Sequence, residues 1–329
     1  MNLYEQQARN RRQTVLVMGV FVAFLLVLGL GFDAAYLASP AGGAFLPIGT
    51  LVAITYGTGS AFYSYRRGDR AVLGSTGAIP LEQAIAGAPD EPTRLALRQY
   101  QNVVEEMAIA AGLPRPAAYV VPDPDPNAFA TGRDPGHASI AVTEGLLRRL
   151  DRDELQGVVA HEMSHIRNYD IRLMTIVAAL VGAIALLADW AARGMRYGAF
   201  GGRRSRGREG GGGPAAILLI AVWLVAVLLA PVVARLLAMM VSRRREFLAD
   251  ATGAELTRNP LALASALRKV DAEAAPTKAV KRGSAHLCIA DPLGRRINAS
   301  RGRLANLFAS HPPMVDRIAA LQAMAYEHT

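Results

Sequence analysis

The sequence is poor in cysteine and in aromatic residues. Its 329 residues include one cysteine, Cys288, and only 6% of them are aromatic. A single cysteine excludes an internal disulfide framework and the cysteine-rich zinc modules. Any metal ion would therefore be held by histidine and carboxylate side chains. Cys288 itself is expected to be a small buried apolar residue.

The sequence also lacks the patterns of nucleic-acid binding. The net charge is +9, yet there is neither an aromatic ribonucleoprotein motif nor zinc-finger spacing. Arginine carries much of the positive charge, and arginines stand beside long apolar segments. Anionic lipid head groups are therefore the partner that this charge favours, and no nucleic-acid partner is expected.

The apolar residues, 52% of the chain, gather in four long blocks. They cover residues 14–32, 41–65, 171–190 and 215–234, and each has about the length of a membrane helix. The first block is long for a signal peptide and contains no charge, which favours a transmembrane helix. Arginines flank the outer ends of the first two blocks, so the positive-inside rule places both ends in the cytoplasm.

A segment rich in glycine and arginine, residues 193–213, separates the third and fourth blocks. Its composition predicts a solvated, disordered loop. Four full crossings would put these arginines on the outer side, against the positive-inside trend. The two blocks either cross the membrane as a hairpin or enter it without crossing fully, and both alternatives stay open.

The region between the second and third blocks is predicted from local signals. Residues 68–80 are expected to form a linker, and apolar periodicity predicts a helix over residues 91–111. A second helix is expected over residues 151–170, where Asp151 and Glu154 fit a capping pair. Short apolar runs between turn residues predict three strands, at residues 117–121, 127–131 and 138–142.

The most specific motif is H-E-x-x-H at residues 161–165. Residues four apart share one face of a helix, so His161 and His165 can both reach one zinc ion. Glu162 projects about 100° further round the helix, where it can accept a proton from an attacking water molecule. The alternative is a helix whose two histidines only form hydrogen bonds.

Two histidines leave a catalytic zinc ion one protein ligand short. Glu246 and Asp250 stand four residues apart on a further predicted helix, so both can face the same site. Glu246 would then bind zinc, and Asp250 would orient one of the ligand imidazoles. The alternative is a solvated charge pair beside the three arginines at residues 243–245.

Several segments together resemble the HtpX-type heat-shock metalloproteases. HEMSHIRNYD at residues 161–170 is similar to the zinc helix of that family, and RRREFLADA at residues 243–251 to its second signature. PNAFATG at residues 126–132 and HPP at residues 311–313, followed by Arg317, match further segments in the same order. The four apolar blocks also follow the order of the family. The CAAX prenyl endopeptidases are more distant relatives with similar zinc motifs.

The resemblance implies a zinc endopeptidase in the bacterial inner membrane, with one zinc ion per chain and its active site facing the cytoplasm. It implies Glu246 as the third zinc ligand, with Asp250 behind an imidazole. It also implies cleavage of misfolded or damaged membrane proteins, as quality control under stress. The expected partners are therefore polypeptide substrates and the lipid bilayer.

Two further residues receive predicted roles from the resemblance. Asn127 and the strand after it are similar to the substrate-side segment of the family. In physical terms, an edge strand can hold an extended peptide by main-chain hydrogen bonds. The strand at residues 138–142 could serve equally, and Asn127 could be only a turn residue. His311 could donate to the oxyanion of the tetrahedral intermediate, supported by Arg317, or it could simply lead into the last helix.

The predicted fold is a mainly α membrane protein with a small α+β, gluzincin-like zinc protease domain and about four membrane helices. Residues 1–65 form a transmembrane pair, residues 171–240 a membrane hairpin, and residues 66–170 and 241–329 the two parts of the protease domain. A catalytically silent, client-binding scaffold is one alternative, although Glu162 is present. A prenyl-protein peptidase is another, but four blocks are too few to enclose its chamber.

Overall fold

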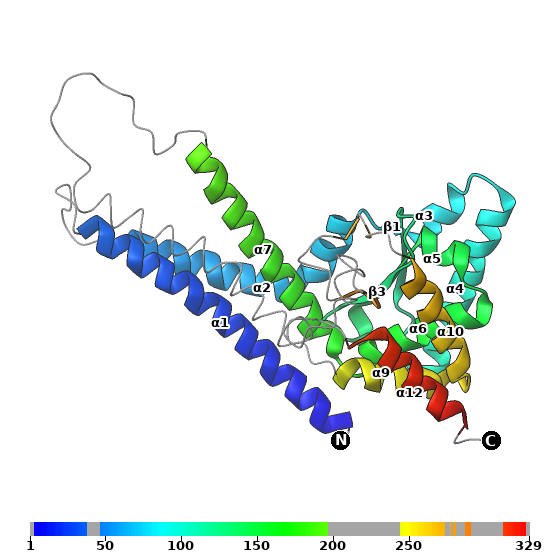
Figure 1. Ribbon diagram of the computed structural model, residues 1–329. Coiled ribbons are helices and arrows are strands. Elements are labelled where there is room, and N and C mark those ends of the chain that lie inside the picture. The colour runs from blue at the N-terminus through cyan, green and yellow to red at the C-terminus, as the bar shows by residue number, and fades with distance from the viewer. Residues whose placement is uncertain are drawn as a thin grey trace.

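The computed structural model describes residues 3–37, 47–196, 244–273, 277, 279–280, 287–290 and 312–326. Three long helices extend from a compact α+β part that surrounds a small sheet (Figure 1). The fourth apolar block, most of the segment rich in glycine and arginine, and His311 lie outside the described residues.

The N-terminal helix α1 (Leu3–Leu37) lies alongside α2 (Ile48–Thr76). A Cβ atom on Gly29 of α1 would lie 2.6 Å from the Gly49 backbone oxygen of α2, so the missing side chain permits close contact. Asp33 accepts hydrogen bonds from the backbone nitrogens of Gly49 and Thr50 at 2.7 and 2.9 Å, which caps the first turn of α2. Asp33 directly follows the first apolar block in the sequence and lies inside α1, which continues to Leu37.

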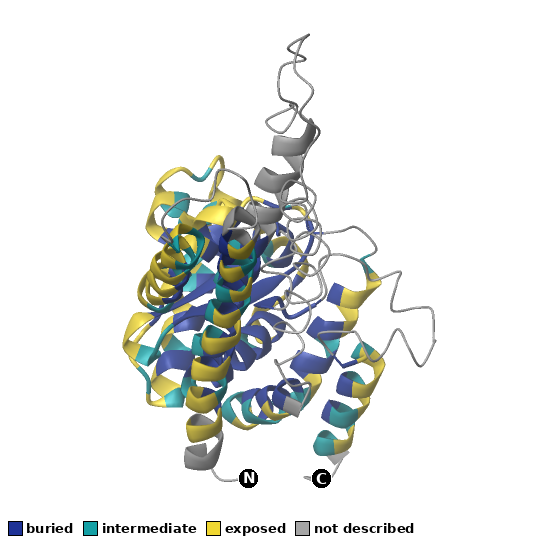
Figure 2. Ribbon diagram, turned by 90° about the vertical axis from the view of Figure 1, so that its left-hand side faces the viewer, coloured by how far each residue is buried: buried dark blue, intermediate teal, exposed yellow. Residues whose placement is uncertain are grey.

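Of the described helices, α1 alone is long and apolar enough to cross a membrane, over Ala8–Gly31 with a mean hydropathy of 2.6. Exposed residues predominate along α1 and buried residues in the compact part (Figure 2). Large apolar side chains are exposed on both α1 and α2, among them Val15, Val27, Leu51 and Val52. The prediction of four membrane helices stays a prediction.

The predicted linker at residues 68–80 is wrong for most of its length, because α2 continues to Thr76. The helix bends at Arg67, whose φ of −136° and ψ of 18° are not helical. A Cβ atom on Gly68 would lie 3.0 Å from Cγ2 of Thr175, so glycine lets α2 pass close to α7. Packing against α7 therefore keeps a glycine- and charge-rich segment helical.

The sheet has four strands, β1 (Ile79–Pro80), β2 (Ala117–Val121), β3 (Ala128–Gly132) and β4 (Ala138–Thr143). Their order is β1-β2-β4-β3, with β4 parallel to β2 and antiparallel to β3. The three predicted strands are confirmed to within one residue at each end. Since β4 has a strand on each side, it cannot take up a substrate strand, and that predicted alternative is wrong.

The helices of the compact part follow the apolar pattern of the sequence. In α4 (Glu91–Ala111), Asp90 accepts a hydrogen bond from the Thr93 nitrogen, and Gly112 ends the helix with a φ of +64°. The others are α3 (Leu81–Ala86), α5 (Glu144–Arg149), α6 (Arg152–Arg167), α9 (Arg244–Thr257), α10 (Pro260–Ala272) and α12 (Met314–Tyr326). Helix α6 is central, and its residues 157–166 are all buried.

The predicted helix over residues 151–170 is confirmed from Arg152 to Arg167, but it ends there and a new helix begins at Asp170. Helix α6 begins at the predicted capping box, in which Asp151 and Glu154 bond each other's backbone nitrogen. Tyr169 has a φ of +58°, a left-handed conformation that ends α6, and α7 (Asp170–Arg196) begins at the next residue. The turn sends α7 towards α1 and α2 (Figure 1) and leaves Asp170 beside the end of α6.

Candidate metal centre

Three potential metal ligands meet between α6 and α9. One donor atom from each of His161, His165 and Glu246 lies within 4.8 Å of the other two, and all three residues are buried. Nε2 of His161 is 3.8 Å from Oε2 of Glu246, and Nε2 of His165 is 3.7 Å from Oε1. The single carboxylate thus faces both imidazoles.

A glycine allows α9 to approach α6 closely enough for this arrangement. A Cβ atom on Gly253 of α9 would lie 3.1 Å from the backbone nitrogen of His161. A larger residue would require α6 or α9 to shift by a few tenths of an ångström. Because Glu246 and Gly253 lie two turns apart on the same side of α9, the close contact at Gly253 helps to determine the distance between the Glu246 carboxylate and the imidazoles.

The His161 imidazole is backed by a buried ion pair. Its Nδ1 lies 2.9 Å from Oδ1 of Asp250. Arg317 binds the same carboxylate with two hydrogen bonds, of 2.8 Å from Nε and 2.7 Å from Nη2. Burial alone would raise the pKa of Asp250, but the Arg317 guanidinium keeps it below its ordinary value. Burial lowers the pKa of His161, which favours the neutral form that binds metal.

Arg317 was expected to support His311 at an oxyanion. Its side chain is 0% exposed and lies behind the metal ligands, where Nη1 also donates to the Ile289 oxygen at 2.9 Å. Nη1 lies 3.4 Å from Oε2 of Glu246 as well. Arg317 therefore holds two carboxylates of the centre, a role that no local pattern in the sequence indicated.

The His165 imidazole is backed by a different carboxylate. Its Nδ1 lies 3.2 Å from Oδ2 of Asp170, the first residue of α7. Oδ1 of Asp170 accepts a hydrogen bond of 2.7 Å from Nδ2 of Asn10 in α1, and Nη1 of Arg245 lies 3.6 Å away. Burial alone would lower the pKa of His165, but Asp170 and Glu246 raise it to about 9.

The parts played by Asp170 and Asn10 were not predicted from the sequence. Asp170 ends the HEMSHIRNYD segment, and an acidic residue five positions after the second histidine was the available signal. A continuous helix would have turned Asp170 away from His165, so the break at Tyr169 is needed for the contact. Nothing in the sequence around Asn10 connects it with a site 160 residues away.

Glu162 is buried beside the three ligands. Its Oε2 has no hydrogen-bond partner among the described residues. Burial is the main cause that raises the pKa of Glu162, and Glu246 acts in the same direction; although His165 and Arg317 lower it, the pKa is raised to about 7. A carboxylate with a pKa near neutrality can accept and return a proton at physiological pH.

Asn127 lies just before β3 and is buried. Its Nδ2 donates to Oγ1 of Thr277 and to the Ala290 oxygen, both at 3.1 Å, and its Oδ1 accepts from the Ala128 nitrogen at 3.1 Å. The amide thus ties the start of β3 to residues 277 and 290. Direct contact of this amide with a peptide would require these bonds to break.

The edge of β3 that faces away from β4 lies next to Glu162. Thr143 donates to the Asn127 oxygen, so the alternation of an antiparallel ladder turns the backbone of Ala128, Ala130 and Gly132 towards that edge. The Ala128 oxygen accepts from the Ile289 nitrogen, and the Gly132 nitrogen donates to Thr175. Ala130 is the residue whose backbone hydrogen bond reaches Glu162.

The donor set fits one divalent transition-metal ion. Two imidazoles and one carboxylate are the ligands of many catalytic zinc sites, and each imidazole has a carboxylate behind it. The buried Oε2 of Glu162 adds an acceptor aimed at no protein donor among the described residues. The arrangement has the parts needed for metal-assisted hydrolysis.

Comparison with known proteins agrees with this chemistry. The chain matches peptidase family M48 over residues 95–325. It is 41% identical over 322 residues to the "Protease HtpX homolog" of Caldanaerobacter subterraneus subsp. tengcongensis, with 98% of both chains covered. It is 42% identical over 322 residues to the "Protease HtpX homolog" of Lactiplantibacillus plantarum, with 98% of this chain and 100% of that chain covered.

Among solved structures, S. mikatae Ste24p is similar with a TM-score of 0.41 and 19% identity. The similarity covers 82% of this chain and 64% of that chain, which is less than two thirds of its length. The family match and the identity along nearly the whole chain show that this protein is a metalloprotease and belongs to peptidase family M48.

Proposed function

We propose that the protein is a zinc-dependent membrane endoprotease in which His161, His165 and Glu246 hold one zinc ion. The observation that carries this proposal is the meeting of the three donor atoms within 4.8 Å, with Glu162 beside them. When bound, zinc would act as a Lewis acid towards the scissile carbonyl group and the attacking water. The family match supports a metal, and the donor set favours zinc.

The residues around the ligands have separate proposed tasks. Asp250 and Asp170 hold the two imidazoles in the orientation needed for binding, as carboxylates behind metal ligands commonly do. Glu162 takes a proton from the attacking water and returns it to the leaving amine. His311 stays a proposed donor to the oxyanion, from a position outside the described residues.

The proposed substrate is an extended polypeptide that lies along β3. The Ala130 backbone faces Glu162 on the edge of β3 that faces away from β4, between the bonds of Ala128 to Ile289 and of Gly132 to Thr175. A peptide paired there, in exchange for those bonds, would pass the proposed metal ligands. The proposed part of Asn127 is then indirect, because its amide fixes the start of β3 against residues 277 and 290. In this proposal the peptide contacts the backbone of β3, and the Asn127 side chain does not touch it.

The proposed setting is the bacterial inner membrane, with the active site facing the cytoplasm. The candidate span in α1 supports a membrane location, and the arginines before it support the orientation. In this proposal residues 1–65 form a transmembrane pair, residues 171–240 a membrane hairpin, and residues 66–170 and 241–329 the two parts of the protease domain. Misfolded or damaged membrane proteins are the proposed substrates, cleaved as quality control under stress.

The decisive experiment measures metal and cleavage in the same preparation. We expect the detergent-purified protein to contain one zinc ion per chain and to cleave an unfolded membrane protein until a chelator is added. Glu162→Gln should keep the zinc and abolish cleavage, because the amide cannot accept a proton. Glu105→Gln, on the exposed side of α4, is the matched control and should cleave normally. Undiminished cleavage by Glu162→Gln would refute the mechanism.

A further inference from the structure

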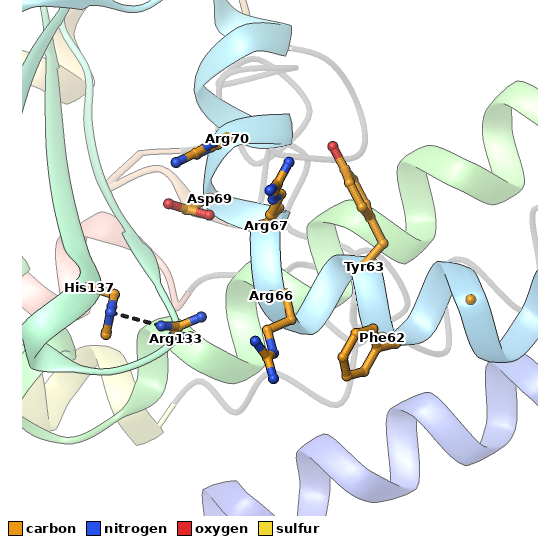
Figure 3. Close-up of a pocket in the computed structure, with 9 residues that line it drawn as sticks. Phe62, Tyr63, Arg66, Arg67, Asp69, Arg70, Arg133 and His137 are labelled. Atoms are coloured by element: carbon orange, nitrogen blue, oxygen red, sulfur yellow. Dashed lines mark hydrogen bonds between the residues drawn. The ribbon is translucent and has the colours of Figure 1, made fainter.

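A basic pocket lies apart from the metal centre, at the bend of α2. Its volume is about 570 Å³, and it opens between α2 and the turn that joins β3 to β4 (Figure 3). We call it the bend pocket, and the side chains that matter for its chemistry are Phe62, Tyr63, Arg66, Arg67, Arg70 and Arg133. None of the proposed metal ligands lines it.

The bend pocket has an excess of positive charge. Four guanidinium groups, the His137 imidazole and one carboxylate, that of Asp69, line it. Arg133 already has an acidic partner, since its Nε lies 3.4 Å from Oδ2 of Asp134, and its Nη2 lies 2.7 Å from Nε2 of His137. Within the part of the chain that the structure describes, Arg66, Arg67 and Arg70 form no ion pair with a carboxylate. These three arginines are exposed, so water screens the repulsion between them, and an anion with several oxygens would give their guanidinium groups a direct hydrogen-bonding partner.

The two walls of the bend pocket are joined by Arg172 of α7. Its Nε donates to the backbone oxygen of Arg133 at 2.6 Å. Its guanidinium carbon also lies 5.8 Å from the ring centre of Tyr65 and 5.3 Å from that of Tyr169. The turn that carries Arg133 is thus fixed relative to α2, and the pocket is formed by the fold itself.

The bend pocket lies where α2 changes from apolar to charged. Before the bend, α2 exposes large apolar side chains, among them Leu51, Val52 and Phe62. The first arginine follows at Arg66, and its guanidinium carbon lies 5.1 Å from the ring centre of Phe62. For a helix that enters a bilayer, this change marks the level of the lipid head groups. A ligand bound here would contact arginines at one end and apolar surface at the other.

We infer that the bend pocket binds the phosphate group of an anionic phospholipid, whose acyl chains lie along the exposed apolar face of α2. This inference rests on the membrane location in the proposed function, and it does not depend on the catalytic chemistry. Arg133 follows Gly132, the last residue of β3. A lipid bound at Arg133 therefore stabilises the end of the strand on which the proposed substrate lies.

The test compares lipids in mixed micelles with the full-length Glu162→Gln variant, which is expected to be stable against self-cleavage. Phosphatidylglycerol should bind, whereas phosphatidylcholine and inorganic phosphate should not compete with it. Replacement of Arg66, Arg67 and Arg70 by Gln should weaken phosphatidylglycerol binding about 100-fold, since each arginine near an anionic lipid contributes about fivefold. Native mass spectrometry and lipid titration measure both the number and the affinity of bound lipids.

The matched control removes the same charge elsewhere. Replacement of Arg94, Arg98 and Arg115 by Gln, on or beside α4, should leave the affinity within about twofold. Arg133→Gln provides a single change, with an expected loss of about fivefold, should the triple variant fail to fold. Equal binding of both lipids, an equal loss in the control, or displacement by inorganic phosphate would each overturn the inference.

The outcome is separable from that of the proposed function. Zinc content and chelator-sensitive cleavage are measured on the wild-type protein, without any reference to lipid. If cleavage and zinc are found but lipid selectivity is not, the lipid inference alone is wrong. If lipid selectivity is found and zinc is not, the lipid inference stands and the catalytic proposal is wrong.

Discussion

The two imidazoles on α6 are held by different regions of the molecule. The His161 imidazole contacts Asp250 of α9, and Arg317 of α12 binds that carboxylate with two hydrogen bonds. The residues that hold His161 therefore all belong to the compact part. The His165 imidazole contacts Asp170 at the start of α7, and Asn10 of α1 donates a hydrogen bond to that carboxylate. One imidazole is thus anchored in the protease core, and the other is anchored to the long helices.

The difference shows how the long helices and the metal centre can influence each other. A displacement of α1 relative to α6 would change the contact between Asn10 and Asp170, and with it the position of the His165 imidazole. The same displacement would not move the groups that hold His161, because Arg317 is fully buried between α9 and residue 289. Each side of the comparison can be tested by removing one group.

The largest effect is expected from Glu246→Ala, because Glu246 faces both imidazoles at 3.7 and 3.8 Å. This change removes the one proposed ligand that serves both sides, so zinc content should fall below about one tenth per chain and cleavage should be lost. Elemental analysis and a cleavage assay measure the two effects. Glu255→Ala, an exposed glutamate on the same helix, should retain both. Stoichiometric zinc in Glu246→Ala would reject this ligand.

An intermediate effect is expected from Arg317→Gln, which disrupts the support of His161. The change leaves the buried carboxylate of Asp250 without its cation, and a broken buried pair costs about 3–5 kcal/mol in the free energy of unfolding. Thermal unfolding of the zinc-free and zinc-loaded protein gives the measurement. Arg152→Gln breaks an exposed pair with Glu106 and should cost less than about 1 kcal/mol. Equal losses in the two variants would contradict the structural role of Arg317.

The smallest effect is expected from Asn10→Ala, on the His165 side. The loss of one hydrogen bond to Asp170 should weaken zinc binding by about two- to tenfold, while the compact part keeps its thermal stability. Competition with a chelator measures the zinc affinity. Asn102→Ala, an exposed change on α4, is the matched control. An unchanged affinity in Asn10→Ala would separate α1 from the metal centre and remove the contrast between the two imidazoles.

Much of the compact part could be predicted from short stretches of sequence. The helix at residues 91–111, the capping box at Asp151 and the strands follow from periodicity and from residues a few positions apart. The pairing of His161 with His165 follows from helix geometry in the same way. Each of these features depends on residues that are close together in the sequence, so a short segment is enough to predict it.

The segments that were predicted wrongly depend on partners distant in the chain. Residues 68–76 contain glycine and charged residues typical of a linker, yet Gly68 lets them continue as helix against Thr175. The break at Tyr169 interrupts a pattern that favoured one helix through residue 170. In both cases tertiary packing outweighed the local preference.

The sequence by itself predicted the helix that carries His161 and His165, the place of Glu162 on it and a further carboxylate from elsewhere as the third proposed ligand. Only the tertiary structure decided which groups hold the imidazoles, because Asn10 meets Asp170 across 160 residues and Arg317 meets Asp250 across 67. Such contacts depend on how helices pack, which no periodicity within one helix encodes. The same packing formed the bend pocket, since its arginines come from α2 and from the turn that follows β3.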